Sequence, residues 1–272
     1  MVSRPRGNVL NRRRMELSVV IPVRDEAGNI APLVAEIAAA LDGRLDYEIV
    51  YVDDGSRDAT AAEIRRLQHS VPRLRLVRHQ TGCGQSAAIR SGVKAARGAW
   101  IATLDGDGQN DPSDIPLLWQ IAREAPARPL LVAGRRARRR DSWSKRQSSR
   151  IATAVRRRLL DDATPDSGCG LKLLPRALFL DLPYFDHMHR FLPALVLREG
   201  GEVRSVPVNH RPRQRGRSKY GVFDRLWVGI ADLAGVLWLR RRAARPVLIA
   251  EAATEEPAPA AVEPQRAEPV LP

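Results

Sequence analysis

The chain has 272 residues, of which 44% are apolar, enough for one large domain with a full hydrophobic core. The formal net charge of +14 indicates an anionic partner, such as a phosphorylated substrate, a membrane surface or nucleic acid, or else a solvated basic surface. Two cysteines, Cys83 and Cys169, give neither a disulfide framework nor a metal-binding spacing, so we expect reduced thiols in a cytoplasmic protein.

The two ends of the chain differ in composition from its middle. Residues 1–14 are basic without an apolar core, which predicts a flexible arm rather than a signal peptide. Residues 246–272 are rich in Ala, Pro and Glu, which predicts a disordered tail. Between them we expect one domain over 15–221 and a separate helix over 222–245. The longest apolar run, 226–239, is shorter than the ~20 residues that span a bilayer.

Predicted strands and helices alternate through the first half of the chain. Short apolar runs predict the strands, and apolar residues at helical spacing predict helices between them. The predicted strands are Leu17–Pro22, Tyr47–Val52, Leu74–His79, Trp100–Asp105 and Leu130–Ala133. This alternation predicts an α/β fold with a mainly parallel central sheet covered on both faces. Ligands of such sheets bind at the carboxyl ends of the strands.

An acidic loop, "DGDGQNDP", follows the fourth predicted strand and therefore lies at this edge. Asp105 and Asp107 are separated by one residue, so on extended chain their carboxylates point the same way. Such a pair suits Mg²⁺ or Mn²⁺ shared with substrate phosphates, and Gln109 can add an oxygen or order a bound water. Gly106 lets the backbone turn and a ligand approach. The alternative is a solvated acidic turn without a ligand. A second acidic loop is predicted at the same edge of the sheet, which favours the metal-binding interpretation.

The second acidic loop, "DDGS" at 53–56, ends the second predicted strand. Asp53 and Asp54 are suited to accept hydrogen bonds from a base edge or from ribose hydroxyls. Ser56 or Asp58 is equally suited to cap the helix that follows, and both roles can hold at once.

Two further motifs each allow two interpretations. "GCGQSA" at 82–87 loosely matches a dinucleotide fingerprint, which raises the alternative of a nicotinamide-dependent oxidoreductase. Against it, the motif follows the third strand rather than the first, and glycines are also used for close helix–sheet packing. The basic loop "RPRQRGRSKYG" at 211–221 offers Arg213 and Lys219 as a phosphate clamp, or is a solvated surface loop.

In this order, the motifs resemble those of the family-2 glycosyltransferases, in particular the branch that acts on polyprenyl phosphates. The resemblance covers roughly Leu17 to Leu239. Its motifs are "VVIPVRDEAGNI", "VDDGSRDAT", "GQSAAIRSGVKAARGAWIATLDGDGQNDP", "VAGRR", "DSGCGLKL", "HRFLPALV" and "HRPRQRGRSKYG". It implies a nucleotide-diphosphate-sugar-binding fold of Rossmann-like type, with 15–221 as the catalytic domain of a glycosyltransferase.

The resemblance also implies roles for individual residues. Nucleotide contacts fall on Pro22, Arg24, Glu26, Asp53, Asp54, Asp105 and Gly106, metal contacts on Asp105, Asp107 and Gln109, diphosphate contacts on Arg136, Arg213 and Lys219, and an acceptor-side role on Asp166. Of these, Asp105, Asp107, Asp166, Arg213 and Lys219 are the expected catalytic set. One motif departs from the family, because Arg24-Asp25-Glu26 stands where an aromatic residue and Asn-Glu are common.

The implied reaction is an inverting transfer of a sugar from a GDP- or UDP-sugar to a polyprenyl (undecaprenyl or dolichyl) phosphate, with Mg²⁺ or Mn²⁺. A phosphate acceptor is mostly ionised near neutrality and needs no strong general base, whereas a sugar-hydroxyl acceptor, the alternative, needs a carboxylate base. Nucleic acid is disfavoured as a partner because aromatic residues are few and no nucleic-acid-binding motif is recognised. A homo-oligomer stays possible.

The segment Asp224–Arg242 is expected to form an amphipathic helix in the membrane interface. Its predicted apolar stripe consists of Leu226, Ile230, Leu233 and Leu237, widened by Trp227, Ala234 and Trp238. Together with the basic residues of 135–158 and 211–219, this helix predicts a peripheral protein on the cytoplasmic face of an anionic membrane. A helix docked on the protein's own core, or at a dimer contact, is the competing interpretation.

Overall fold

The structure, a computed structural model, describes residues 15–125, 128–136, 156, 158–162, 164–212 and 224–244, with side chains from 229 onward in the last range. The predicted arm at 1–14 and tail at 246–272 lie outside the described residues. The described strands form one seven-stranded sheet in the order β3-β2-β1-β4-β6-β5-β7. All neighbouring strands are parallel except β6, which pairs antiparallel with both β4 and β5.

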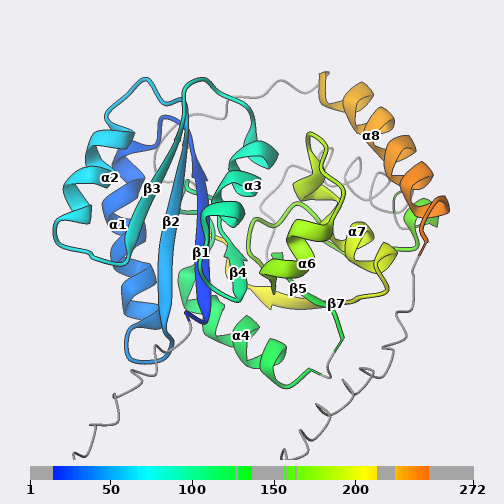
Figure 1. Ribbon diagram of the computed structural model, residues 1–272, viewed down its shortest axis with the longest axis horizontal. Coiled ribbons are helices and arrows are strands. Elements are labelled where there is room, and N and C mark those ends of the chain that lie inside the picture. Colours follow the sequence, from blue (N-terminus) through cyan, green and yellow to red (C-terminus); the bar gives the residue numbers. More distant parts are fainter. Residues whose placement is uncertain are drawn as a thin grey trace, which may run out of the picture.

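Helices cover both faces of the sheet (Figure 1). The strands are β1 Leu17–Val23, β2 Tyr47–Asp54, β3 Leu74–His79, β4 Trp100–Thr103, β5 Leu130–Arg136, β6 Lys172–Pro175 and β7 Glu202–Val208. The helices are α1 Ala27–Leu41, α2 Thr60–Gln68, α3 Gln85–Ala95, α4 Ile115–Arg123, α6 Arg176–Asp181, α7 Leu192–Arg198 and α8 Asp224–Arg241. The α/β, mainly parallel prediction is confirmed.

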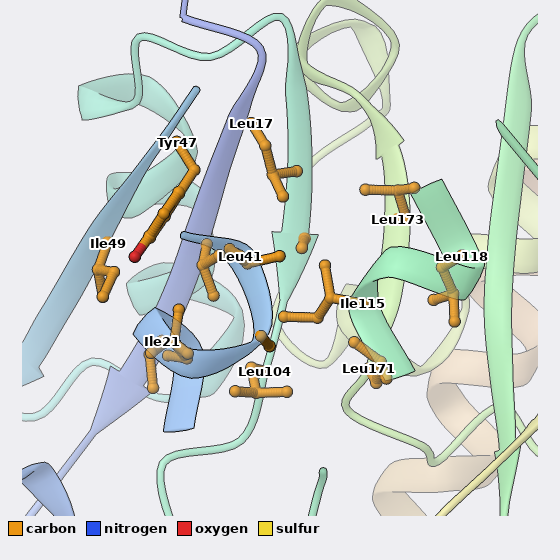
Figure 2. Close-up of a cluster of buried hydrophobic side chains, with 14 of the residues drawn as sticks. Leu17, Ile21, Leu41, Tyr47, Ile49, Leu104, Ile115, Leu118, Leu171 and Leu173 are labelled. Carbon is orange, nitrogen blue, oxygen red and sulfur yellow. The ribbon is translucent and has the colours of Figure 1, made fainter. Parts of the chain in front are cut away.

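The buried side chains form one cluster on each face. Residues of α1, α2 and α4 pack on one face, where Ile21, Leu41, Tyr47 and Ile115 are almost fully buried (Figure 2). Residues of α3, α6, α7 and α8 pack on the other face. Successive side chains of a strand point to opposite faces of the sheet, so each strand contributes to both clusters. In β1, Val19 and Ile21 belong to the first cluster and Val20 to the second.

The strands predicted in the first half are all present, although β4 ends at Thr103 rather than Asp105 and β5 extends to Arg136. The second half, which the sequence left without predicted strands, contributes β6 and β7 to the sheet. Because β6 runs against its neighbours, its first residue, Lys172, lies opposite Thr103 of β4 and Ala133 of β5. Lys172 therefore lies at the same edge as the carboxyl ends of the parallel strands.

Helix α8 packs beside α7 at the outer side of the second cluster (Figure 1). Val236 is fully buried there, with Leu233 and Leu237 partly buried. Ile230 and Trp238, which the sequence places on the same stripe, are 51% and 58% exposed. The predicted stripe is thus divided between the protein core and the surface. None of the helices that the structure describes has the length and apolar character to cross a membrane.

Candidate active site

The loops after β1 and β2 are joined by hydrogen bonds at the carboxyl edge of the sheet. The amide of Asp25, a residue with φ of 53°, donates to Ser56 Oγ at 2.9 Å, and the amide of Glu26 donates to Thr60 Oγ1 at 2.9 Å. The Glu26 carboxylate accepts from Asn29 Nδ2 at 2.6 Å, at the start of α1. These bonds hold the first loop firmly against the second, so the two predicted nucleotide-binding loops form one surface.

Asp53 and Asp54, adjacent in sequence, have different environments. Asp53 is fully buried and accepts from the Ser56 amide at 2.9 Å and from Arg78 Nε at 3.0 Å. Asp54 accepts from the Gly84 amide at 2.9 Å and from the Cys83 amide at 2.8 Å, and so holds the loop that begins α3. Gly84 has φ of 91°, which explains a glycine at this turn. Asp54 thus has a structural function whatever ligand binds nearby.

Asp54, His79 and Cys83 place metal-ligating atoms within 4.8 Å of one another, and no other such trio occurs in the described part of the chain. Their hydrogen bonds account for the cluster without an ion. His79 Nδ1 lies 2.7 Å from Asp54 Oδ1, His79 Nε2 lies 2.9 Å from Ser91 Oγ, and Cys83 Sγ lies 3.3 Å from the Thr81 carbonyl. The predicted metal residues belong to a different loop.

Asp105 lies just beyond β4, with its carboxylate against the Cα atom of Gly170. A Cβ atom at Gly170 would lie 2.2 Å from Asp105 Oδ2, so only glycine fits. Gln85 Nε2 donates to Asp105 Oδ1 at 2.9 Å. Burial, followed by the negative charge of Asp107, raises the pKa of the Asp105 carboxyl from 3.8 to about 6. The two carboxylates therefore repel one another across a short gap, an arrangement that a divalent cation would stabilise.

The rest of the acidic loop is fixed by the end of β7. Asp107 Oδ1 accepts from the Gln109 amide at 3.1 Å, while Gln109 Nε2 donates to the Arg211 carbonyl at 3.3 Å. Arg211 in turn pairs with Glu36 at 2.9 Å and Asp111 at 2.8 Å. Among the described residues the side-chain oxygen of Gln109 has no hydrogen-bond partner, which suits a cation or its water. The oxygen-rich donor set of this loop fits Mg²⁺ or Mn²⁺.

Gly106 has a packing function in the acidic loop. A Cβ atom there would lie 2.3 Å from Val23 Cγ1, so this glycine lets the acidic loop pack against β1. Gly108, with φ of 73°, is the residue that makes the turn. The position of Asp105 and Asp107 next to Pro22 and Val23 depends on this close packing.

Arg136 and Asp166, predicted for the diphosphate and the acceptor, form an ion pair with each other. Arg136 Nε and Nη2 each donate to the Asp166 carboxylate at 2.7 Å. Burial by itself lowers the pKa of Arg136, but the hydrogen bonds and charge of Asp166 raise it overall. Arg136 Nη2 also approaches Gly168, 3.3 Å from where a Cβ atom would be. The pair therefore borders the cleft that Gly168 lines.

This cleft, of about 210 Å³, opens beside Asp105. Its polar lining includes Gln85 and Asp105 and three basic side chains, Lys172, His189 and Arg190. Burial lowers the pKa of Lys172, against the opposing influence of Cys169, Asp105 and Asp166. Burial and the nearby charge of Lys172 place the pKa of His189 well below 6.5, so this imidazole is neutral at pH 7. Ser86 Oγ lies 2.7 Å from His189 Nδ1 and orients the ring.

The structure thus brings most of the predicted site residues to one edge. Arg213 and Lys219 lie outside the described residues; the described chain before them reaches this edge at Arg211. The sequence analysis did not single out Gln85, Lys172, His189 and Arg190. All four stand inside quoted motifs: Gln85 in "GQSAAIR", Lys172 in "DSGCGLKL", and His189 and Arg190 at the start of "HRFLPALV". Their position in those motifs was the available signal.

Comparison with known proteins identifies the family of the chain. The family model "Glycosyl transferase family 2" matches residues 18–182. The chain is 37% identical over 238 residues to dodecaprenyl-phosphate galacturonate synthase of Rhizobium johnstonii, covering 85% of this chain and 69% of that protein. It is 33% identical over 208 residues to undecaprenyl-phosphate 4-deoxy-4-formamido-L-arabinose transferase of Edwardsiella ictaluri, covering 76% of this chain and 63% of that protein.

Among solved structures, the chain resembles glucosyl-3-phosphoglycerate synthase from Mycobacterium tuberculosis in complex with Mg²⁺ and uridine diphosphate. The TM-score is 0.61 at 19% identity, over 86% of this chain and 81% of that chain, which establishes a common fold. The family model covers more than half of the chain, and both curated relatives exceed 30% identity. The chain belongs to glycosyl transferase family 2 and is a glycosyltransferase.

Proposed function

We propose that the chain transfers a sugar, with inversion, from a nucleotide-diphosphate sugar to a polyprenyl phosphate. The observation that carries this choice of acceptor is the ion pair between Arg136 and Asp166. Asp105 is the only carboxylate among the described residues that line the cleft, and it faces Asp107. Asp166, the next candidate for a general base, is held by two hydrogen bonds from Arg136. An acceptor that is already ionised requires no such base.

The described residues suit the departure of a nucleoside diphosphate at this edge. Asp105, Asp107 and Gln109 would hold Mg²⁺ or Mn²⁺, which when bound supplies positive charge for the leaving diphosphate. Arg136, which borders the cleft, adds a fixed guanidinium, and Arg213 and Lys219 would add two more cations. Pro22, Arg24, Glu26 and Asp53 would contact the nucleotide. Arg24 Nη1 lies only 2.4 Å from where a Cβ atom on Gly82 would be, so the side chain of Arg24 reaches from the loop after β1 to the loop after β3.

The names of the similar proteins support the proposed acceptor and donor classes. The relatives are named for dodecaprenyl-phosphate galacturonate and for an undecaprenyl-phosphate arabinose derivative, so lipid phosphates are common to both. The structural neighbour is described with Mg²⁺ and uridine diphosphate, which favours a uridine donor among the GDP- and UDP-sugars. A galacturonosyl donor is the first to test, because its relative has the higher identity of the two.

We also propose that α8 places the domain on an anionic membrane. Ile230, Ala234 and Trp238 form an exposed apolar row at helical spacing. Arg242 lies over the Trp238 ring at 5.7 Å, and Arg241 is exposed beside it. An apolar row with cations at its end suits a surface of anionic lipids. The cytoplasmic face is the side on which nucleotide sugars are available.

The function is tested by incubating the chain with Mn²⁺, UDP-galacturonate and undecaprenyl phosphate and detecting the lipid-linked sugar by mass spectrometry. Undecaprenol, which lacks the phosphate, is the matched control. We expect product with the phosphate alone, and an anomeric configuration opposite to that of the donor. Transfer to undecaprenol or to a sugar hydroxyl at an equal rate would refute the phosphate acceptor, and a panel of GDP- and UDP-sugars separates a wrong donor from a wrong acceptor.

A further inference from the structure

Lys172 is a buried cation whose hydrogen-bonding capacity is mostly unused. The residue is 3% exposed and lines the cleft beside Asp105. An ammonium has three donors, yet in the described part of the chain Lys172 Nζ forms one hydrogen bond, to the Cys169 carbonyl. A buried ammonium with unused donors is costly unless it meets an anion or further acceptors.

The anions of the protein near Lys172 have other partners in the working enzyme. Asp166 is already paired with Arg136 through two hydrogen bonds. Asp105 and Asp107 would be balanced by the divalent cation that they hold. Once that cation is in place, no carboxylate among the described residues is left to balance the charge of Lys172. The charge of Lys172 is therefore available to an anion of the substrates.

A second cation lies in the same cleft. Arg190 lines it from the 3-10 turn Met188–Arg190, and within the described residues its guanidinium has no hydrogen bond or ion pair. Lys172 projects from a central strand of the sheet, where its backbone is paired on both sides with Thr103 and Ala133. A cation on so rigid an element has a fixed position, which suits a group that orients a reacting substrate.

We propose that Lys172, together with Arg190, binds the phosphate of the lipid acceptor and orients it for attack. The inference rests on the proposed function and assigns residues to its acceptor. On the proposed function, the donor diphosphate would be met by the divalent metal, Arg136, Arg213 and Lys219, whereas the acceptor phosphate needs a separate set. Lys172 and Arg190 hold non-attacking oxygens of that phosphate and leave one oxygen free to react.

The step balances without a proton acceptor. An ionised phosphate oxygen forms the new bond to the anomeric carbon, and the bond from that carbon to the diphosphate oxygen breaks. The bonding electrons leave with the nucleoside diphosphate. Lys172 and Arg190 stay protonated throughout, because they balance charge and supply hydrogen bonds rather than move a proton.

The test measures acceptor binding and donor binding separately. Farnesyl phosphate serves as the acceptor probe and Mg²⁺ with UDP as the donor-side probe, both followed by ³¹P NMR titration. Lys172→Met removes the charge and keeps the length of the side chain, and Lys172→Arg restores the charge. Lys94→Met is the matched control, because Lys94 is an exposed lysine on α3. UDP binding reports whether each variant is folded.

We expect Lys172→Met to weaken farnesyl phosphate binding by roughly 10- to 100-fold, the usual effect of losing a charged hydrogen bond, with UDP binding unchanged. Lys172→Arg should recover part of the affinity, and Lys94→Met should match the wild type. Equal farnesyl phosphate affinity in Lys172→Met and wild type would overturn the proposal, as would a loss of UDP affinity of the same size. If the wild type binds UDP but no farnesyl phosphate, the proposed function fails instead, which keeps the two failures distinguishable.

Discussion

Arg136 and Asp166, thirty residues apart in sequence, form a bidentate ion pair at the border of the substrate cleft, with both N–O distances at 2.7 Å. The Arg136 amide adds a third bond to the same carboxylate at 3.2 Å. The residues expected to serve the donor and the acceptor separately are therefore one unit. A change in either side chain alters the position of the other and leaves its charge unpaired.

Replacing Asp166 by alanine should impair both stability and transfer. The arginine is 18% and the aspartate 6% exposed, so removing the carboxylate leaves a largely buried guanidinium unpaired. Breaking such a pair costs about 3 kcal/mol in the free energy of unfolding, which urea titration measures. Glu202→Gln, which breaks the exposed pair with Arg204, is the control and should change little. An Asp166→Ala protein as stable and active as the wild type would contradict the coupling.

Asp107→Ala should abolish transfer while the thermal unfolding temperature stays near that of the wild type. The residue lies in a loop beyond β4, half-buried, and serves the cation rather than the hydrophobic core. EDTA should inactivate the wild type in the same way, and Mn²⁺ should restore it. Asp181→Ala, an exposed aspartate at the end of α6, is the matched control. Transfer by Asp107→Ala in the presence of EDTA would end the metal hypothesis.

Gly170→Ala should inactivate the enzyme by moving Asp105. The added methyl group would lie 2.2 Å from Asp105 Oδ2, so the carboxylate must turn away from its present position beside Gln85. A displacement of about 1 Å in a catalytic group costs on the order of 100-fold in rate. Gly229→Ala in α8, with nothing within 4 Å of the added atom, should be neutral. Mn²⁺ titration should show weaker binding in Gly170→Ala alone, and equal binding would argue against this contact.

The first half of the chain was predictable because each element has a local signal. Strands β1 to β4 were predicted from apolar runs that end at acidic or glycine-rich loops. The order of these strands and the family motifs predicted that both acidic loops lie at one edge of the sheet. Strand β6 gave no such signal, since Lys172 interrupts a short apolar segment and the strand is defined by its pairing with β4 and β5. Its place in the sheet depends on residues about seventy positions earlier in the chain.

The sequence predicted which residues belong to the site better than it predicted the contacts between them. The sequence placed Arg136 and Asp166 among the site residues, but only the fold brings the two side chains together. Likewise, the stripe on α8 has the spacing of one apolar face, but the helix turns Val236 and Leu233 inward and leaves Ile230 and Trp238 outside. Helical spacing predicts which residues share one face of a helix, but tertiary packing determines which face is buried.

Glu48 should make the fold sensitive to acid. It is 2% exposed, and burial by itself would raise its pKa, but bonds from Ser18, Arg75 and the Arg97 amide lower the pKa overall. A carboxyl with a folded pKa below its unfolded value of 4.5 adds stability that is present above that pH and lost as the pH falls through the folded value.

The free energy of unfolding of the wild type should therefore exceed that of Glu48→Gln at pH 7, and the difference should shrink below about pH 4.5, close to the unfolded pKa of a glutamate. Urea titration across this range measures it. Glu63→Gln is the control and should show a much smaller dependence, because Glu63 lies at the surface, is only partly covered and pairs with the exposed Arg66. A difference that grows as the pH falls would mean that Glu48 is not ionised in the folded protein.

Binding to anionic membranes should depend on the exposed row of α8. Burying a side chain such as Ile or Trp in an apolar environment is worth about 2 kcal/mol, so Ile230→Ser with Trp238→Ser should weaken binding to phosphatidylglycerol vesicles by well over tenfold. Leu117→Ser is the matched control, because Leu117 is 43% exposed on α4, which covers the opposite face of the sheet. Vesicle sedimentation measures the binding, which should also weaken at high salt.

If the double variant binds as well as the wild type, the basic segment 135–158 becomes the candidate anchor. If the wild type is a dimer by gel filtration and the double variant a monomer, the row is a subunit contact instead, because a side chain buried between two subunits is not available to lipid.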